Sequence, residues 1–160
     1  FQWATSTEDR NRLWKMRHAA YTSCLAARPG CMGLVTDICV PISRLAEAVA
    51  QTRADIAAEG LTGPILGHVG DGNFHAILLL DRNDPDEFKR AKRVAGKMAE
   101  RALAMGGTIT GEHGIGLGKR GLMAAEHGQG WQVMGAIKAA LDPQGILNPG
   151  KLVPQPGDDA

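Results

Sequence analysis

Apolar residues recur every three to four positions through five stretches of the chain, which is the spacing of amphipathic helices. The first stretch covers residues 6–27 and follows a capping box of Thr5 and Glu8. The other helices are expected over residues 43–59, 85–105, 119–127 and 131–141. The residues expected to face the core are Leu13, Ala20, Cys24, Leu45, Val49, Ile56, Phe88, Ala91, Val94, Met98, Trp131, Met134, Ile137 and Leu141.

Short apolar runs bounded by glycine, proline or aspartate predict strands between these helices. They are VTDICV (35–40), ILGHV (65–69), FHAILLL (74–80) and TIT (108–110). Mixed strands and helices with a hairpin in the middle favour an α+β fold, an antiparallel sheet covered by helices. A helical and turn-rich segment ends the chain, with residues 142–160 forming a proline-containing tail.

Composition excludes several classes of function. Lys and Arg number 18 against 17 acidic residues, so no net field favours nucleic acid. No apolar run reaches the ~20 residues of a membrane span, and we expect no transmembrane segment. Cys24, Cys31 and Cys39 are odd in number and lack CxxC spacing, which is typical of reduced thiols. The chain begins at Phe1 without a signal-peptide pattern, and we expect it to be part of a longer protein.

Two histidines flank the turn in GHVGDGNFH (67–75). If Asp71 and Gly72 form a two-residue turn, His68 pairs with His75, with Cβ atoms about 4.5–5.5 Å apart. Two imidazoles at that distance suit one divalent metal ion. The alternative is a pair of partly buried histidines that bond to backbone or water.

A second cluster places Glu112 and His113 between Gly111 and Gly114. Adjacent side chains on a regular strand point to opposite faces, so the pair converges on one site only in an irregular loop, which glycine permits. Two histidines and a glutamate are a recurrent catalytic metal set, and His113 would then act as a base. The alternative is that Glu112 is an ordinary solvated acid.

Arg17 falls on the apolar face of the first predicted helix. Such an arginine either extends to solvent or binds an anion in a cavity, and its planar fork suits a carboxylate. The segment GLGKRG (116–121) matches a dinucleotide-binding pattern, but it lacks the preceding strand and the later ribose-binding acid.

The segments GHVGDGNFH, TITGEHGIGLGKR and LDPQGILNPGKL occur in an order and spacing that resemble the C-terminal part of FAD-linked 2-hydroxy-acid dehydrogenases of the vanillyl-alcohol oxidase type. LWKMRHAAY, RPGCMG and TDICVPISRL are most similar to the D-lactate dehydrogenase (cytochrome) branch. The likeness runs from about Trp14 to Val153. It implies a ferredoxin-like cap domain over residues 1–141, with residues 142–160 returning to an FAD-binding domain outside this sequence.

The resemblance also implies roles for individual residues. In the hydroxyglutarate enzymes of this family a lysine lies two residues before the strand aspartate, whereas here Val35 precedes Asp37. This departure argues against a substrate with a second carboxylate. The implied roles are a zinc or manganese site at His68, His75 and Glu112, a base at His113, a carboxylate-binding Arg17, and Asn148 next to the flavin.

The expected reaction is oxidation of D-lactate or a similar small D-2-hydroxy acid to the 2-oxo acid, with metal-assisted deprotonation of the hydroxyl and hydride transfer to FAD. Electrons would pass on to a cytochrome, a quinone or a flavoprotein. A glycolate oxidase subunit is the alternative within the family. A metal-dependent hydrolase and a non-catalytic α+β binding module remain open outside it. We expect a cytoplasmic location in a bacterium or a mitochondrial one in a eukaryote.

Overall fold

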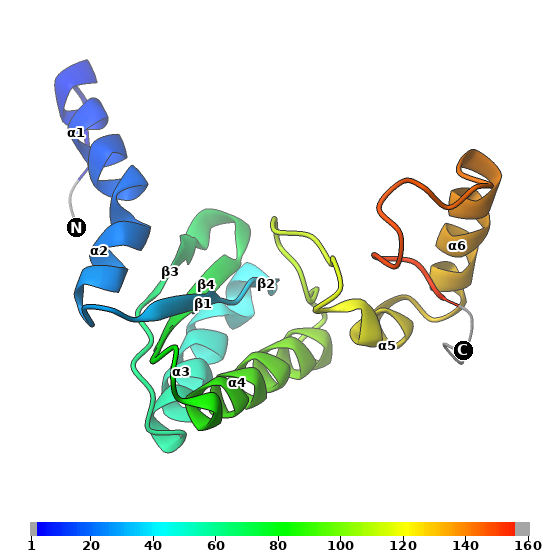
Figure 1. Ribbon diagram of the computed structural model, residues 1–160. Coiled ribbons are helices and arrows are strands. Elements are labelled where there is room, and N and C mark those ends of the chain that lie inside the picture. Colours follow the sequence, from blue (N-terminus) through cyan, green and yellow to red (C-terminus); the bar gives the residue numbers. More distant parts are fainter. Residues whose placement is uncertain (1–2, 156–160) are drawn as a thin grey trace. The chain divides into compact units, whose positions relative to one another are not determined.

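The computed structural model describes residues 3–155, which divide into two compact units (Figure 1). Of these residues, the first unit takes 3–36, 49–66 and 75–95, and the second takes 37–48, 67–74 and 96–155. The helices are α1 (Thr7–His18), α2 (Ala20–Ala26), α3 (Ile42–Ala58), α4 (Pro85–Ala104), α5 (Met123–His127) and α6 (Gln129–Leu141). The strands are β1 (Met32–Val35), β2 (Ile38–Cys39), β3 (Ile65–His68) and β4 (Asn73–Leu80). Helices with a small antiparallel sheet confirm the α+β class.

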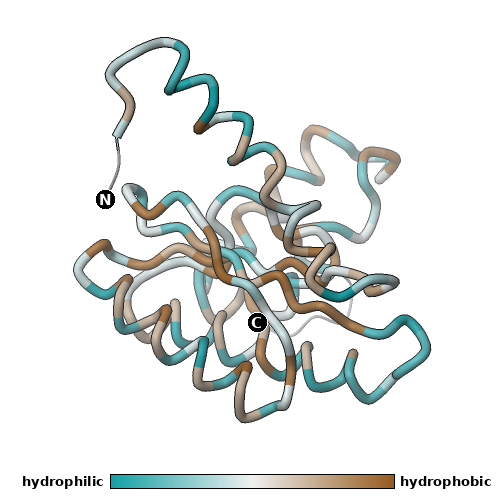
Figure 2. Tube along the Cα trace, turned by 90° about the vertical axis from the view of Figure 1, so that its left-hand side faces the viewer, coloured by the Kyte–Doolittle hydropathy of each residue, from teal (hydrophilic) through white to brown (hydrophobic). Residues whose placement is uncertain are grey.

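β4 is the central strand of the sheet, and all eight of its residues are buried. In the first unit β1 pairs antiparallel with it, from Met32 opposite Leu80 to Val35 opposite Ile77. Figure 2 shows continuous hydrophobic stretches along the trace, and a strand buried along its whole length, like β4, is expected to be such a stretch. The buried residues that α3 and α4 contribute to this unit include Ile56, Ala91 and Val94.

The first predicted helix is two helices, α1 and α2, separated at Ala19. Its N-cap is Ser6, whose hydroxyl accepts a 3.1 Å hydrogen bond from the Asp9 amide, so the predicted capping box at Thr5 is wrong by one residue. Neither helix has a fully buried residue, and teal predominates in the helix near the N label of Figure 2. The predicted apolar face is therefore only half-buried.

Two other expectations about the core are wrong. Phe88 is 43% exposed, with the Lys92 ammonium 5.5 Å from its ring centroid. On α6, Ile137 and Leu141 are exposed, at 55% and 77%. Helical periodicity identifies one face of a helix but not the length of that face that a neighbour covers.

The second unit has its own apolar cluster of Ala99, Ile109, Met123 and Trp131. Here β2 pairs with β4 through Ile38 opposite Phe74 and Cys39 opposite Asn73. The predicted strand over residues 108–110 is reduced to an isolated bridge between Thr108 and Cys39. The Trp131 indole N–H donates a 2.8 Å hydrogen bond to the Leu152 carbonyl, which fastens the chain after α6 to that helix.

The pairing predicted for the hairpin is wrong by two residues. In the first unit Thr62 lies opposite Leu79, and the Ile77 amide donates a 2.9 Å hydrogen bond to the Pro64 carbonyl. This register places Leu66, not a second histidine, directly opposite His75. The predicted cross-strand pairing of His68 with His75 is therefore wrong.

The turn geometry gives the physical reason. Val69–Asp71 form a single 3₁₀ turn, and Gly72 follows with φ of 76°, in the left-handed region that glycine adopts without strain. The Gly72 amide donates back to the Val69 carbonyl, 3.3 Å away. A four-residue loop closed by Gly72 replaces the two-residue turn at Asp71 and Gly72.

Among residues 3–155, no helix has both the length and the apolar character needed to cross a bilayer.

Candidate active site

A cavity of about 270 Å³ lies in the second unit at the end of the hairpin. Its lining residues come from β2, the ends of β3 and β4 with the loop between them, and the loop after residue 110; they are Cys39, His68, Asp71, Asn73, Gly111 and Glu112. Two residues of the predicted site, His68 and Glu112, therefore share this cavity.

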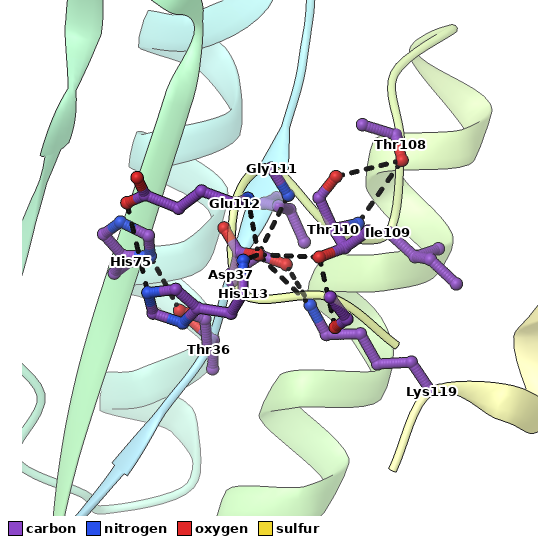
Figure 3. Close-up of polar contacts among 12 residues, drawn as sticks. Thr36, Asp37, His75, Thr108, Ile109, Thr110, Gly111, Glu112, His113 and Lys119 are labelled. Atoms are coloured by element: carbon purple, nitrogen blue, oxygen red, sulfur yellow. Dashed lines mark hydrogen bonds and ion pairs between the residues drawn. The ribbon is translucent and has the colours of Figure 1, made fainter. Parts of the chain in front are cut away.

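The buried carboxylate of Asp37 organises the loop that carries Glu112 and His113 (Figure 3). Its Oδ2 accepts hydrogen bonds from three consecutive backbone amides, those of Gly111, Glu112 and His113, at 2.9, 3.0 and 2.9 Å. The Thr110 hydroxyl donates to the same oxygen at 2.8 Å. Successive N–H groups that converge on one anion require a curved backbone, not a strand. The irregular loop predicted at this position is confirmed.

The other oxygen of Asp37 fixes a second residue of the cavity. The Asn73 side-chain amide donates a 2.8 Å hydrogen bond to Asp37 Oδ1 and a 3.0 Å hydrogen bond to the Ile38 carbonyl. Both partners are acceptors, so the Asn73 Nδ2 must face them. A Cβ on Gly111 would collide with the Asn73 amide and the Asp37 carboxylate, which explains the absence of a side chain at residue 111.

Electrostatics keeps Asp37 ionised. Burial alone would raise its pKa, but the hydrogen bonds from the His113 amide, the Asn73 side chain, the Glu112 amide and the Thr110 hydroxyl together hold the pKa well below its usual range. The Lys119 ammonium lies 3.5 Å from Oδ2 and donates 2.7 Å to the Asp37 carbonyl. Burial lowers the pKa of Lys119, an effect that the Asp37 charge opposes.

The Glu112 carboxylate lies between two imidazoles. Its Oε1 is 3.7 Å from His68 Nε2 and 4.0 Å from His113 Nε2. The three side chains are between 41% and 47% exposed, so a ligand can reach them. Zinc binds nitrogen and oxygen ligands at about 2.0–2.2 Å, which puts two ligands of one ion about 3.0–3.6 Å apart. The His68 and Glu112 atoms fit a divalent metal with little adjustment, and their chemistry suits zinc or manganese.

His75 lies on β4 in the first unit and is 3% exposed. Its Nδ1 is 3.0 Å from the Thr36 carbonyl oxygen. A carbonyl only accepts, so Nδ1 is the donor of this hydrogen bond. Metal-binding histidines characteristically donate their second ring N–H to a backbone carbonyl in this way.

The other two predicted residues are Arg17 and Asn148. Arg17 is half-buried on α1 in the first unit. Asn148 follows α6 in the second unit, has φ of 46°, and lines a separate cavity of about 200 Å³ with Lys138, Asp142 and Lys151 among its neighbours. Asn148 does not line the cavity that holds His68.

No functional role was expected from the sequence for Asp37, Asn73, Thr110 or Lys119. One signal was present: Asp37 is the only charged residue in the apolar run VTDICV. A charge in a buried strand requires partners, but the sequence does not show that those partners are the amides of a loop far along the chain.

The profile of the family described as "FAD linked oxidases, C-terminal domain" matches residues 1–152. The chain belongs to this family. It is 53% identical over 154 residues to the probable mitochondrial D-lactate dehydrogenase of Danio rerio, covering 96% of this chain and 31% of that protein. It is 41% identical over 155 residues to the mitochondrial D-lactate dehydrogenase [cytochrome] of Arabidopsis thaliana, covering 96% of this chain and 27% of that protein.

A relative with another printed activity also aligns along most of the chain. The glycolate oxidase subunit GlcD of Bacillus subtilis is 36% identical over 153 residues, covering 94% of this chain and 32% of that protein. The chain thus spans about a third or less of the length of these curated relatives. The comparisons confirm the resemblance drawn from the motifs and show that the chain is a C-terminal domain of the FAD-linked oxidase family.

Proposed function

We propose that this chain is the substrate-binding part of a flavoenzyme that oxidises D-lactate, or a similarly small D-2-hydroxy acid, to the 2-oxo acid. The observation that carries the proposal is the Glu112 carboxylate between the His68 and His113 imidazoles in an open cavity. Relatives named D-lactate dehydrogenase, aligned over 96% of the chain, supply the substrate class.

His68, His75 and Glu112 are the proposed ligands of a divalent metal, zinc or manganese. The 3.7 Å separation of the His68 and Glu112 atoms supports two of them, and the hydrogen bond from His75 Nδ1 to the Thr36 carbonyl, the kind of contact that orients metal-binding histidines, supports the third. When bound, the metal supplies a Lewis acid that stabilises the alkoxide form of the substrate hydroxyl.

The other residues of this chain orient the substrate and move its proton. His113 receives the hydroxyl proton on its imidazole, next to the Glu112 carboxylate. Arg17 holds the substrate carboxylate through its guanidinium fork. FAD, when bound, would supply the two-electron oxidant for the C2 hydrogen of the substrate. Residues 1–141 form the cap domain, and the tail with Asn148 leads to the flavin domain, which passes electrons to a cytochrome, quinone or flavoprotein acceptor.

Glycolate is the second candidate substrate, because a glycolate oxidase subunit aligns over 94% of the chain. Both acids fit a site without a lysine for a second carboxylate, since Val35 precedes Asp37.

The test is anaerobic mixing of the full-length flavoprotein with D-lactate, L-lactate, glycolate or D-2-hydroxyglutarate, followed by the loss of flavin absorbance. We expect D-lactate to reduce the flavin fastest. Faster reduction by glycolate would transfer the assignment to the second candidate. No reduction by any small 2-hydroxy acid would refute the proposal.

A further inference from the structure

We infer that Asp37 is a positioning residue of the active site: its ionised side chain imposes the loop conformation that directs Glu112 and His113 toward a common ligand. Asp37 itself does not bind that ligand. The inference rests on the proposed metal site for its function, but the hydrogen bonds that carry it stand independently.

The Asp37 carboxylate already accepts hydrogen bonds on both of its oxygens. Oδ2 accepts four hydrogen bonds of 2.8–3.0 Å, from three amides and the Thr110 hydroxyl. Oδ1 accepts one from Asn73. The carboxyl is 2% exposed. Although carboxylates are common metal ligands, this one is occupied by hydrogen-bond donors on both oxygens.

Most of the donors to Asp37 Oδ2 are backbone amides of the loop that carries the site residues. The three amides belong to Gly111, Glu112 and His113, so the two functional residues are held by their own backbone. In an extended segment the side chains of residues 112 and 113 would point to opposite faces. Here His113 Nε2 lies 4.0 Å from Glu112 Oε1. Convergence of adjacent side chains is therefore linked directly to the anion that gathers their amides (Figure 3).

The negative charge of Asp37 also supports this role. The hydrogen bonds to the Asp37 carboxylate come from N–H and O–H donors, and the Lys119 ammonium lies 3.5 Å from Oδ2. An asparagine at residue 37 would have nearly the same shape, but its NH₂ group would face either the Asn73 amide or the loop amides. Both orientations set donor against donor. Shape without charge should not support the loop.

The decisive variant is Asp37→Asn in the full-length flavoprotein, with Asp86→Asn as the matched control on the exposed first turn of α4. Residues that orient metal ligands typically change metal affinity or activity by about 10–100-fold when replaced. We expect zinc affinity and kcat of the folded Asp37→Asn protein to fall within that range. Amide hydrogen exchange across residues 111–113 should accelerate by at least about tenfold. Asp86→Asn should change none of these.

Thr110→Val provides a milder variant in case Asp37→Asn does not fold. It removes one donor to Oδ2 and leaves the three amides in place. We expect a two- to tenfold loss of zinc affinity, about the effect of one hydrogen bond. A lower melting temperature with unchanged zinc affinity, kcat and exchange at residues 111–113 in both folded variants would overturn the inference. If the wild-type protein binds no metal, the proposed metal site fails, while the exchange measurement still decides the role of Asp37.

Discussion

His68 Nε2 lies 3.7 Å from Glu112 Oε1, although one residue belongs to the hairpin and the other to a loop far along the chain. Neither the hairpin nor the loop supplies both of these side chains alone. The cavity that contains both is the place where the two motifs of the sequence become one site.

Removal of either side chain should therefore abolish tight metal binding. We expect His68→Ala and Glu112→Gln each to lose at least tenfold in zinc or manganese affinity, because each variant deletes one donor of the set. Metal content after dialysis and titration with Co²⁺, followed by its visible absorption, measure this loss. His127→Ala, on α5, is the control. Stoichiometric metal of unchanged affinity in the Glu112→Gln variant would remove Glu112 from the ligand set.

His113 could be a base or a metal ligand, because its Nε2 is 4.0 Å from the same Glu112 oxygen that His68 approaches. As the base, it is needed for proton removal but not for metal binding. We expect His113→Ala to slow the rate at which D-lactate reduces the flavin by at least about 100-fold, the usual contribution of a general base, while bound metal is retained. Stopped-flow absorbance and metal analysis of the same sample make the comparison. Parallel loss of metal and activity would instead make His113 a ligand.

The fold class was predictable because it depends on local periodicity and on strong turn signals such as the Asp84-Pro85 start of α4. The hairpin register was not. It depends on whether Gly72 closes a four-residue loop or completes a two-residue turn, and the same letters allow both. A shift of two residues keeps each side chain on its face, so the apolar pattern of β4 could not reveal the error.

The site was predictable only where glycines indicated an irregular backbone. Gly111 and Gly114 allowed the convergence of Glu112 and His113 to be expected. The agent of that convergence, Asp37, was not predictable, because it bonds to main-chain amides that every residue carries. A hydrogen bond from a backbone amide does not depend on the side chain of the residue that donates it, so the sequence does not show it.

Arg17 should affect substrate binding more than chemistry. It is half-buried on the face of α1 that also carries Leu13. A charged hydrogen bond to a carboxylate contributes about 1.5–3 kcal/mol. We expect Arg17→Met to raise KM for D-lactate by about 10–100-fold, with a smaller change in kcat. Steady-state kinetics with the neutral exposed variant Arg12→Met as control test this, and an unchanged KM would exclude Arg17 from the substrate site.

Gly111 should not tolerate a methyl group. Its φ is not positive, so the cost of Gly111→Ala is the collision of Cβ with the Asn73 amide and the Asp37 carboxylate. Overpacking of this kind typically costs about 1–3 kcal/mol. Gly118→Ala is the matched control, since a Cβ there meets no atom within 4 Å. Urea unfolding should show the loss only in Gly111→Ala, together with weaker metal binding. Equal stability of the two variants would show that the loop moves freely away from Asp37.

Asp142 should make the second unit sensitive to acid. Asp142 is buried. The hydrogen bond that its carboxylate accepts from the Lys138 ammonium lowers its pKa, although burial acts in the opposite direction. The Leu147 and Ile146 amides, which donate hydrogen bonds of 2.9 and 3.1 Å to the carboxylate, lower the pKa further. A carboxyl with a lower pKa in the folded state stabilises the fold fully above its unfolded pKa, about 3.9, and loses that contribution as pH falls through the folded value.

The expected outcome is a decrease in the free energy of unfolding of the wild type below about pH 4, part of which disappears in Asp142→Asn. At pH 7 the variant should be less stable than the wild type, and the two curves should converge toward pH 2. Urea unfolding followed by tryptophan fluorescence at a series of pH values measures the difference. Lys138→Met, which removes the partner charge, should reduce the same acid dependence. Parallel curves for wild type and Asp142→Asn across this range would show that other carboxylates govern the acid response.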